Sequence, residues 1–340
     1  MMNLIDNVDL GVVYQLLKFD DVTDVSLKNG GEIWVTSNIK GHYLHDATTC
    51  EAEILRIASQ LACKMQKDFN PSFPSLEGDL QSDEDDYRFG CVHPYLSPSG
   101  CVIVFRKVRK KLFLTFKKLV EENSISKEAL NLLILAVKSK LNMIFIGTTG
   151  SGKTELLKYL SQFIPEDEVV VTIEDSLEFN LKKLVPKISV SEFRIKESIS
   201  YRDVISMSLR LNVQRILLQE ARGEEVSDLL DAMSTGHTVL TTMHASKIEQ
   251  LPLRILQMLK LVDLSYSSIE KRVYQLIDIV IKMKSFKSDD GIKRVVEEIA
   301  YFEYCINEKK CIYHTLYLHN QSVEKIPKTL MAHLKGYNHV

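Results

Sequence analysis

The chain has 340 residues, of which 45% are hydrophobic and 26% are charged, and its formal net charge is −2. This length predicts two domains, and the composition is that of an ordinary globular protein. The 14 glycines and 8 prolines are about half the usual share, which excludes collagen-like and linker-dominated chains. The near-neutral charge excludes a global field that would draw the whole chain onto nucleic acid or anionic lipid.

The sequence carries no signal for a membrane span or for a cysteine framework. The longest apolar run, Leu132–Val137, is far below the roughly 20 residues that a bilayer requires. The first ten residues carry acids where a signal peptide would carry bases, so we expect a cytoplasmic protein. Six cysteines form no C-x-x-C pair, and we expect free thiols, with neither a structural zinc nor disulfides.

The first third of the chain predicts a small α+β domain over residues 1–108. Glu32–Thr36 and Cys101–Phe105 are rich in β-branched and aromatic residues, which is typical of strands. Ala52–Lys67 has apolar residues at helical spacing. The segment Asn70–Gly100, between this helix and the second strand, holds four of the eight prolines and is predicted to be rich in turns.

A basic segment, Arg106–Lys118, marks a change in composition, and we place a linker over residues 109–125. A helix capped by Ser126 opens the second domain, residues 126–340. Short apolar strands then alternate with helices, which predicts a mostly parallel sheet with helices on both faces. The last forty or so residues return to β-like runs. The predicted strands are Met143–Ile146, Val169–Ile173, Ile216–Leu218, Val239–Thr242, Arg294–Ile299 and Cys311–Leu318.

Residues 147–154 read G-T-T-G-S-G-K-T and match the phosphate-loop motif G-x-x-x-x-G-K-[ST]. The motif lies between a predicted strand and a predicted helix, where backbone N–H groups and the helix N-terminus can face phosphate oxygens. Lys153 would reach the β- and γ-phosphates, and the Thr154 hydroxyl would bind Mg²⁺. We therefore expect ATP and Mg²⁺ as cofactors. The predicted nucleotide-binding residues are Gly147, Thr148, Thr149, Gly150, Ser151, Gly152, Lys153, Thr154 and Glu155.

Acidic residues follow two of the predicted parallel strands. Glu174 and Asp175 end one strand, and Glu220 ends another. Because functional groups collect at the carboxyl ends of parallel strands, all three acidic residues should face the phosphate loop. One carboxylate would orient and deprotonate water, and another would hold the metal. His237 and His244 flank the next strand, and we expect them to sense the γ-phosphate.

The order of these motifs resembles a known family. The phosphate loop is followed by I-E-D-S-L-E-F (173–179), I-L-L-Q-E-A-R-G (216–223), T-G-H (235–237) and T-T-M-H-A (241–245). This order, and the segment 87–107 before it, is similar to the secretion and pilus "traffic" ATPases. These power type II and type IV secretion, conjugation, Tad/Flp pilus assembly and pilus retraction. The likeness runs from about residue 70 to residue 300.

The resemblance implies a RecA-like P-loop ATPase domain over residues 126–340. It implies a homo-hexamer at the cytoplasmic face of a membrane, where it works on a membrane platform protein. It makes Glu174 a candidate for activating water, and it brings two arginines from the first domain toward the phosphates. Gln219 departs from the family, which usually has glycine there. The implied catalytic residues are Glu174, Glu220, Lys153, Arg88, Arg106, His237 and His244, and the implied metal ligands are Thr154, Asp175 and Glu220.

Two other functions stay open at this stage. A P-loop ring that moves along DNA is disfavoured by the neutral charge and by the lack of an aromatic and basic stacking strip. A nucleotide-gated scaffold that does not hydrolyse ATP would tolerate loss of Lys153. The sequence makes no strong case for direct nucleic-acid binding, and it does not decide the cargo, the direction of work, or which of Glu174 and Glu220 activates water.

Overall fold

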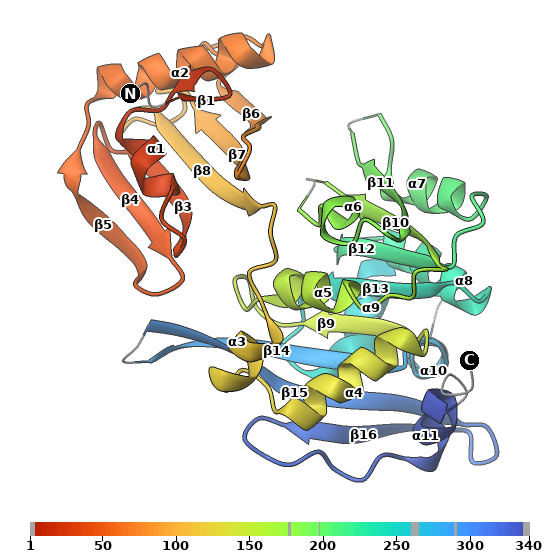
Figure 1. Cartoon of the computed structure of the whole chain (residues 1–340). Helices are drawn as coiled ribbons and strands as arrows, with labels where there is room; N and C mark the ends of the chain where they lie inside the picture. Colours follow the sequence, from red (N-terminus) through yellow and green to blue (C-terminus); the bar gives the residue numbers. More distant parts are fainter. Residues whose placement is uncertain (1–3, 176–177, 197, 260–264, 289–290, 336–340) are drawn as a thin grey trace. The chain divides into compact units, whose positions relative to one another are not determined.

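The computed structural model describes residues 4–175, 178–196, 198–259, 265–288 and 291–335, and the chain divides into two compact units (Figure 1). The first unit is Met1–Lys111 with Lys287–Lys293, and the second is Leu112–Phe286 with Arg294–Val340. The stretch that we assigned to a linker holds a short helix, α3 (Phe116–Glu121), in the second unit. The segment Lys287–Lys293 belongs with the first unit although it lies late in the sequence.

The first unit is an antiparallel six-stranded sheet with two helices. The strands run in the order β5-β4-β3-β8-β7-β6, and α2 (Glu51–Met65) and the shorter α1 share one apolar core with the sheet. The side chains that α2 buries recur at helical spacing, as the sequence predicted. The other elements are β1 (Leu4–Ile5), β2 (Val8–Asp9), α1 (Val12–Leu17), β3 (Val22–Lys28), β4 (Glu32–Ser37), β5 (Gly41–Thr48), β6 (Ser75–Leu80), β7 (Asp85–Val92) and β8 (Val102–Arg109).

The segment Asn70–Gly100 has turns, as expected, but it also contains two strands, β6 and β7, which we did not predict from the sequence. The pairing of β7 with β8 buries Tyr87, Phe89 and Cys91 on one face. The acidic residues and glycines of the β6–β7 hairpin are residue types that favour turns, but pairing with neighbouring strands stabilises an extended conformation. Asp86, for example, forms an ion pair of 2.8 Å with Lys110 just beyond β8.

The second unit contains the predicted, mostly parallel sheet. Its eight strands run in the order β11-β10-β12-β13-β9-β14-β15-β16, and the six from β11 to β14 are parallel. The strands at the β16 edge include an antiparallel pair, β15 with β16. The bounds are β9 (Met143–Ile146), β10 (Val169–Glu174), β11 (Ser189–Arg194), β12 (Arg215–Ala221), β13 (Thr238–Met243), β14 (Ile279–Ser288), β15 (Gly291–Cys305) and β16 (Lys310–Leu318).

Helices cover both faces of this sheet, and each face has its own apolar core. On β9, for instance, Phe145 packs in one core and Ile144 in the other. The predicted cap is present, because the Ser126 hydroxyl accepts the Ala129 N–H at 3.2 Å. One core includes α3, α4 (Lys127–Lys138), α5 (Lys153–Ser161), α6 (Leu181–Leu184) and α11 (Lys328–Lys335), and the other includes α7 (Tyr201–Ser208), α8 (Glu225–Ser234), η1 (Ile248–Gln250), α9 (Leu251–Leu259) and α10 (Tyr266–Leu276).

A buried ion pair stabilises the amino edge of the sheet. Arg215, at the start of β12, is fully buried and donates to the two carboxylate oxygens of Glu168 at 2.8 and 3.0 Å. The same guanidinium donates to the Val137 carbonyl at the end of α4, at 2.9 Å.

Within the described ranges, no helix is long and apolar enough to span a bilayer.

Candidate nucleotide-binding site

The phosphate loop leaves the fully buried strand β9 and enters α5. Gly147, Gly150 and Gly152 have φ values of 146°, 75° and 93°, which L-residues with side chains rarely adopt. A Cβ on Gly147 would lie 2.3 Å from the Met283 carbonyl oxygen of β14. The loop therefore lies so close to the sheet edge that only glycine fits, and its backbone forms a cradle that suits a chain of phosphates.

Lys153 closes this cradle from inside. Its side chain is 7% exposed, and Nζ donates to the Gly147 and Thr148 carbonyls at 2.9 and 3.0 Å. Burial lowers the pKa of Lys153, and the negative charge of Glu220 opposes this shift. The Ser151 hydroxyl also donates to the Thr148 carbonyl, at 2.8 Å. The ammonium group thus lies within the loop, where it would compensate phosphate charge.

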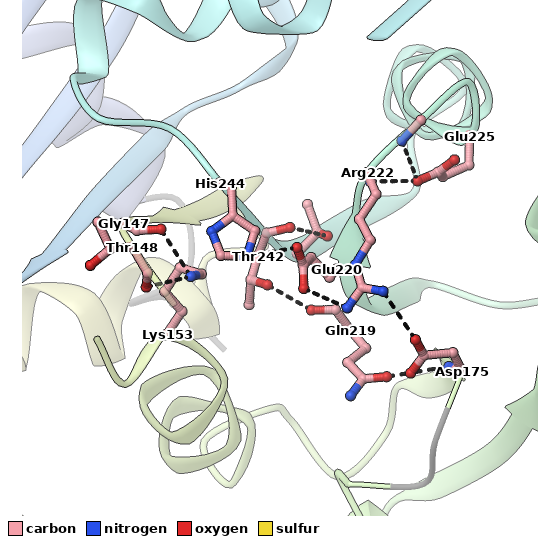
Figure 2. A network of polar contacts seen from close by, with 12 residues as sticks. Gly147, Thr148, Lys153, Asp175, Gln219, Glu220, Arg222, Glu225, Thr242 and His244 are labelled. Carbon is pink, nitrogen blue, oxygen red and sulfur yellow. Dashed lines mark hydrogen bonds and ion pairs between the residues drawn. The ribbon is translucent and has the colours of Figure 1, made fainter. Parts of the chain in front are cut away.

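The carboxyl edge of the sheet brings several predicted residues together (Figure 2). One oxygen of Glu220 lies 3.0 Å from His244 Nε2, and the other accepts from Arg222 at 2.9 Å. Arg222 also reaches Asp175 Oδ2 at 3.3 Å. His244, Glu220, Arg222 and Asp175 form one polar chain because β13, β12 and β10 are parallel neighbours that end at the same edge.

Gln219 links the same three strand ends. Its Oε1 accepts the Asp175 N–H at 3.2 Å, and its carbonyl accepts the Thr242 hydroxyl at 2.8 Å. Glycine, which the traffic ATPases usually have at this position, has no side chain to accept the Asp175 N–H. The departure from the family therefore fixes the backbone at Asp175 relative to Glu220.

Glu174 lies apart from this polar chain. It is fully buried, and its Oε2 accepts the Glu178 and Phe179 N–H groups at 2.6 and 2.8 Å. Its Oε1 is buried and has no hydrogen-bond partner among the residues that the structure describes. Burial raises the pKa of Glu174 to about 8, although the two backbone hydrogen bonds act to lower it. At neutral pH this carboxyl is therefore mostly protonated, and its proton lies on Oε1, because Oε2 accepts the two N–H groups.

The structure does not bring His237 to the site. His237 precedes β13 and His244 follows it, so the strand separates them by roughly 20 Å at the usual rise per residue. His237 Nδ1 lies 3.1 Å from the Thr235 hydroxyl, at the end of α8. We grouped the two histidines because they flank one strand, but residues that flank a strand lie at opposite edges of a sheet.

Arg88 and Arg106 lie in the first unit, where they are directly opposite each other on β7 and β8. Their next neighbours across the sheet are acids, since Asp79 is opposite Arg88 and Asp24 is opposite Arg106. Arg106 Nε donates to Asp24 at 2.8 Å. Four charged residues thus form one row across the sheet, and a role for the arginines at phosphates stays a prediction.

The predicted metal ligands suit Mg²⁺ better than a metal held by protein alone. The described part of the chain contains no group of three His, Cys, Asp or Glu residues placed to bind a metal ion. Mg²⁺ usually keeps waters and binds one or two carboxylates together with substrate phosphates. Thr154 in the first turn of α5 and the carboxylates of Glu220 and Asp175 fit that pattern.

Sequence reasoning missed two arginines of this site. Arg222 lies within the quoted segment I-L-L-Q-E-A-R-G, two residues after Glu220, and this spacing was a usable signal. Arg294 carried no signal, because it is 144 positions from Gly150 in sequence, yet its Nε donates to the Gly150 carbonyl at 2.8 Å. Only the pairing of distant strands brings it to the phosphate loop.

Comparison with known proteins identifies the family. Residues 71–313 match the family model of the type II/IV secretion system proteins. This chain belongs to that family. An uncharacterized protein of Bacillus anthracis is 30% identical over 85% of the chain, and the match spans 63% of that relative's length. VirB11, a type IV secretion system protein of Brucella suis, is 27% identical over 82% of the chain and 85% of its own length.

The fold is also that of solved structures. The pilus retraction motor PilT, crystallised with bound ADP, superposes with a TM-score of 0.63 over 96% of this chain and 86% of PilT, at 18% identity. The shared fold comprises the smaller α+β domain and the RecA-like domain. The predicted family and fold class are therefore confirmed.

Proposed function

We propose that this protein binds and hydrolyses ATP to drive a secretion or pilus machine. The observation that carries the proposal is the placement of Lys153 inside a glycine-rich loop, near the Glu220 carboxylate two strands away in the same sheet. Membership of the type II/IV secretion family supports the coupling to transport. The ADP in the PilT crystal supports a nucleotide as the ligand of this fold.

The loop and α5 perform the binding. The amides of residues 147–155 and the Lys153 ammonium would hold the phosphates, and the Thr154 hydroxyl would bind the metal. Glu220 and Asp175 would supply the carboxylates that hold the metal. Both acids are ion-paired with Arg222 here, so Arg222 would have to release them before they could hold a metal. Mg²⁺ supplies charge compensation on the phosphates.

Glu174 is the residue that we assign to water activation. A general base works best with a pKa near the working pH, and burial raises the pKa of Glu174 to about 8. Its unpartnered Oε1 is the atom that would accept the proton. Glu220, in contrast, has both oxygens bonded to His244 and Arg222, which suits holding a metal and signalling its presence rather than accepting a proton.

Glu174 lies on β10, three strand positions from β9, which is roughly 14 Å at the usual spacing of neighbouring strands. A triphosphate in the loop would point its γ-phosphate toward this side of the sheet, and the attacking water would lie between that phosphate and Glu174. Because Glu174 is fully buried here, water reaches it only after the backbone at Glu178 and Phe179 moves away from the carboxyl.

The motor would be a homo-hexamer at the cytoplasmic face of a membrane, bound to a platform protein of the secretion or pilus machine. Arg88 and Arg106 would approach the phosphates from the first unit. Arginine suits this role because its guanidinium bonds phosphate oxygens in pairs and stays charged.

The test is ATP binding and phosphate release by the purified full-length protein and by Lys153→Ala. We expect the variant to lose nearly all phosphate release, while Lys127→Ala, which changes an exposed lysine at the start of α4, keeps the wild-type rate. Light scattering with ATP should show six subunits. A folded Lys153→Ala protein that hydrolyses ATP at the wild-type rate would refute the proposal, and turnover that requires DNA would favour the translocating ring instead.

A further inference from the structure

The wall of the phosphate loop is built by a hairpin distant in sequence. Arg294, near the start of β15, donates from Nε to the Gly150 carbonyl at 2.8 Å. Its Cδ would lie 3.3 Å from a Cβ on Gly152, so the side chain also packs against the loop where it enters α5. From β14, the backbone of Met283 packs against Gly147.

The hydrogen bond from Arg294 fixes the orientation of the peptide between Gly150 and Ser151, at the tip of the loop. Because a peptide is planar and trans, the Gly150 carbonyl and the Ser151 N–H point in opposite directions. The Ser151 N–H donates to the Thr148 carbonyl at 3.3 Å, and Arg294 bonds the carbonyl at the other end. Gly150 has a φ of 75° and would have nothing within 4 Å of an added Cβ. The tip is therefore a conformationally free residue that the arginine restrains.

Arg294 and Lys153 donate to different carbonyls of the loop. Lys153 bonds those of Gly147 and Thr148 at the start of the loop, and Arg294 bonds that of Gly150 at the tip. When a carbonyl is held by a hydrogen bond, the N–H group of the same peptide has a fixed direction. A preformed anion-binding loop requires N–H groups that are oriented in this way.

Arg294 also marks a boundary between the two units. The segment Lys287–Lys293 belongs to the first unit, and Arg294 is the first residue of β15 that belongs to the second. The side chain that restrains the loop tip is therefore attached to the chain at the point where it passes from one unit to the other.

We propose that Arg294 is a positioning residue of the nucleotide site, which presets the loop tip for phosphate and transmits the state of the loop to the β14–β15 hairpin. This inference rests on the proposed ATP site. Arg294 acts through the Gly150 carbonyl, and its loss should weaken the binding of nucleotide before any chemical step.

The test compares wild type, Arg294→Ala and Arg294→Lys, with Arg202→Ala as the control, since Arg202 is an exposed arginine on α7 whose ion-pair partner is Asp228. The probe is a fluorescent ADP analogue, and the second readout is amide hydrogen exchange without nucleotide. We expect Arg294→Ala to bind the analogue about tenfold more weakly and to exchange residues 147–154 faster. Lysine should restore part of both effects, and the control should change neither.

The link to the hairpin has its own readout. In wild type, the analogue should slow exchange at Gly291–Val295, and in Arg294→Ala this protection should disappear. Unchanged affinity and unchanged loop exchange in Arg294→Ala would overturn the positioning role, and an unprotected wild-type hairpin would overturn the link. A wild-type protein that binds no analogue would instead show that the proposed ATP site is wrong.

Discussion

The most discriminating experiment on the mechanism is the replacement of Glu174 by glutamine. In the wild type, Oε2 accepts two backbone N–H groups at 2.6 and 2.8 Å in a fully buried position. A glutamine oxygen accepts the same two bonds, and the side chain has the same shape. The variant should therefore fold, and it should retain the neutral state that the protonated carboxyl has near pH 7.

The effect on stability has a definite sign. The pKa of Glu174 is raised from 4.5 to about 8 in the folded protein, so the unfolded chain gives up this proton at a lower pH than the folded one does. The contribution of Glu174 to the free energy of unfolding therefore falls as the pH rises from about 4.5 to about 8, by at most about 5 kcal/mol. Glu174→Gln should lack this fall and be more stable than wild type at pH 8.

The effect on activity should be opposite. Glutamine cannot accept the proton of the attacking water, and loss of a general base usually lowers the rate by about 10²–10⁴-fold. Wild-type turnover should rise with pH toward about 8, and Glu174→Gln should retain ATP affinity but lose that rise. The measurements are urea unfolding and phosphate release over pH 5–9. A variant with wild-type turnover would refute the assignment of Glu174 as the base and transfer the role to Glu220.

Three further outcomes follow from the structure. Arg215→Met should lower the free energy of unfolding by about 3–5 kcal/mol, because it leaves the buried Glu168 carboxylate with the more distant Lys140 ammonium, at 4.0 Å, as its ion-pair partner. Urea unfolding should show most of this loss recovered in the double variant with Glu168→Met, and an equal loss in both variants would contradict the pairing. Arg222→Gln removes the guanidinium contact from two carboxylates, Asp175 and Glu220. Mn²⁺ binding to the ADP complex, followed by electron paramagnetic resonance, should therefore tighten by a factor of up to about five, and weaker binding would count against this. In the double alanine variant at Arg88 and Arg106, nucleotide binding should persist while turnover falls roughly 10²-fold; unchanged turnover would exclude a catalytic role.

Local sequence determined much of the second unit. The bounds of the strand Met143–Ile146 were predicted as the structure has them, because a short apolar run directly before a phosphate-loop motif is typical of a buried strand. The Ser126 cap and the carboxyl-edge placement of Glu220 and Asp175 also followed from rules that act within a few residues or along one strand. The hairpin of β6 and β7 did not follow from such local rules. Its strands are stabilised by pairing with β8 and by contacts such as the ion pair of Asp86 with Lys110.

The sequence by itself determined that a phosphate loop, two acidic strand ends and a family likeness occur in one order, since each is a short pattern with its own chemistry. Only the tertiary structure decided which of these groups meet. It placed His244 beside Glu220 and left His237 at the opposite edge, it buried Glu174 and so raised its pKa, and it brought Arg294 to Gly150. Strand order and burial depend on contacts between residues far apart in the chain, and no local pattern encodes them.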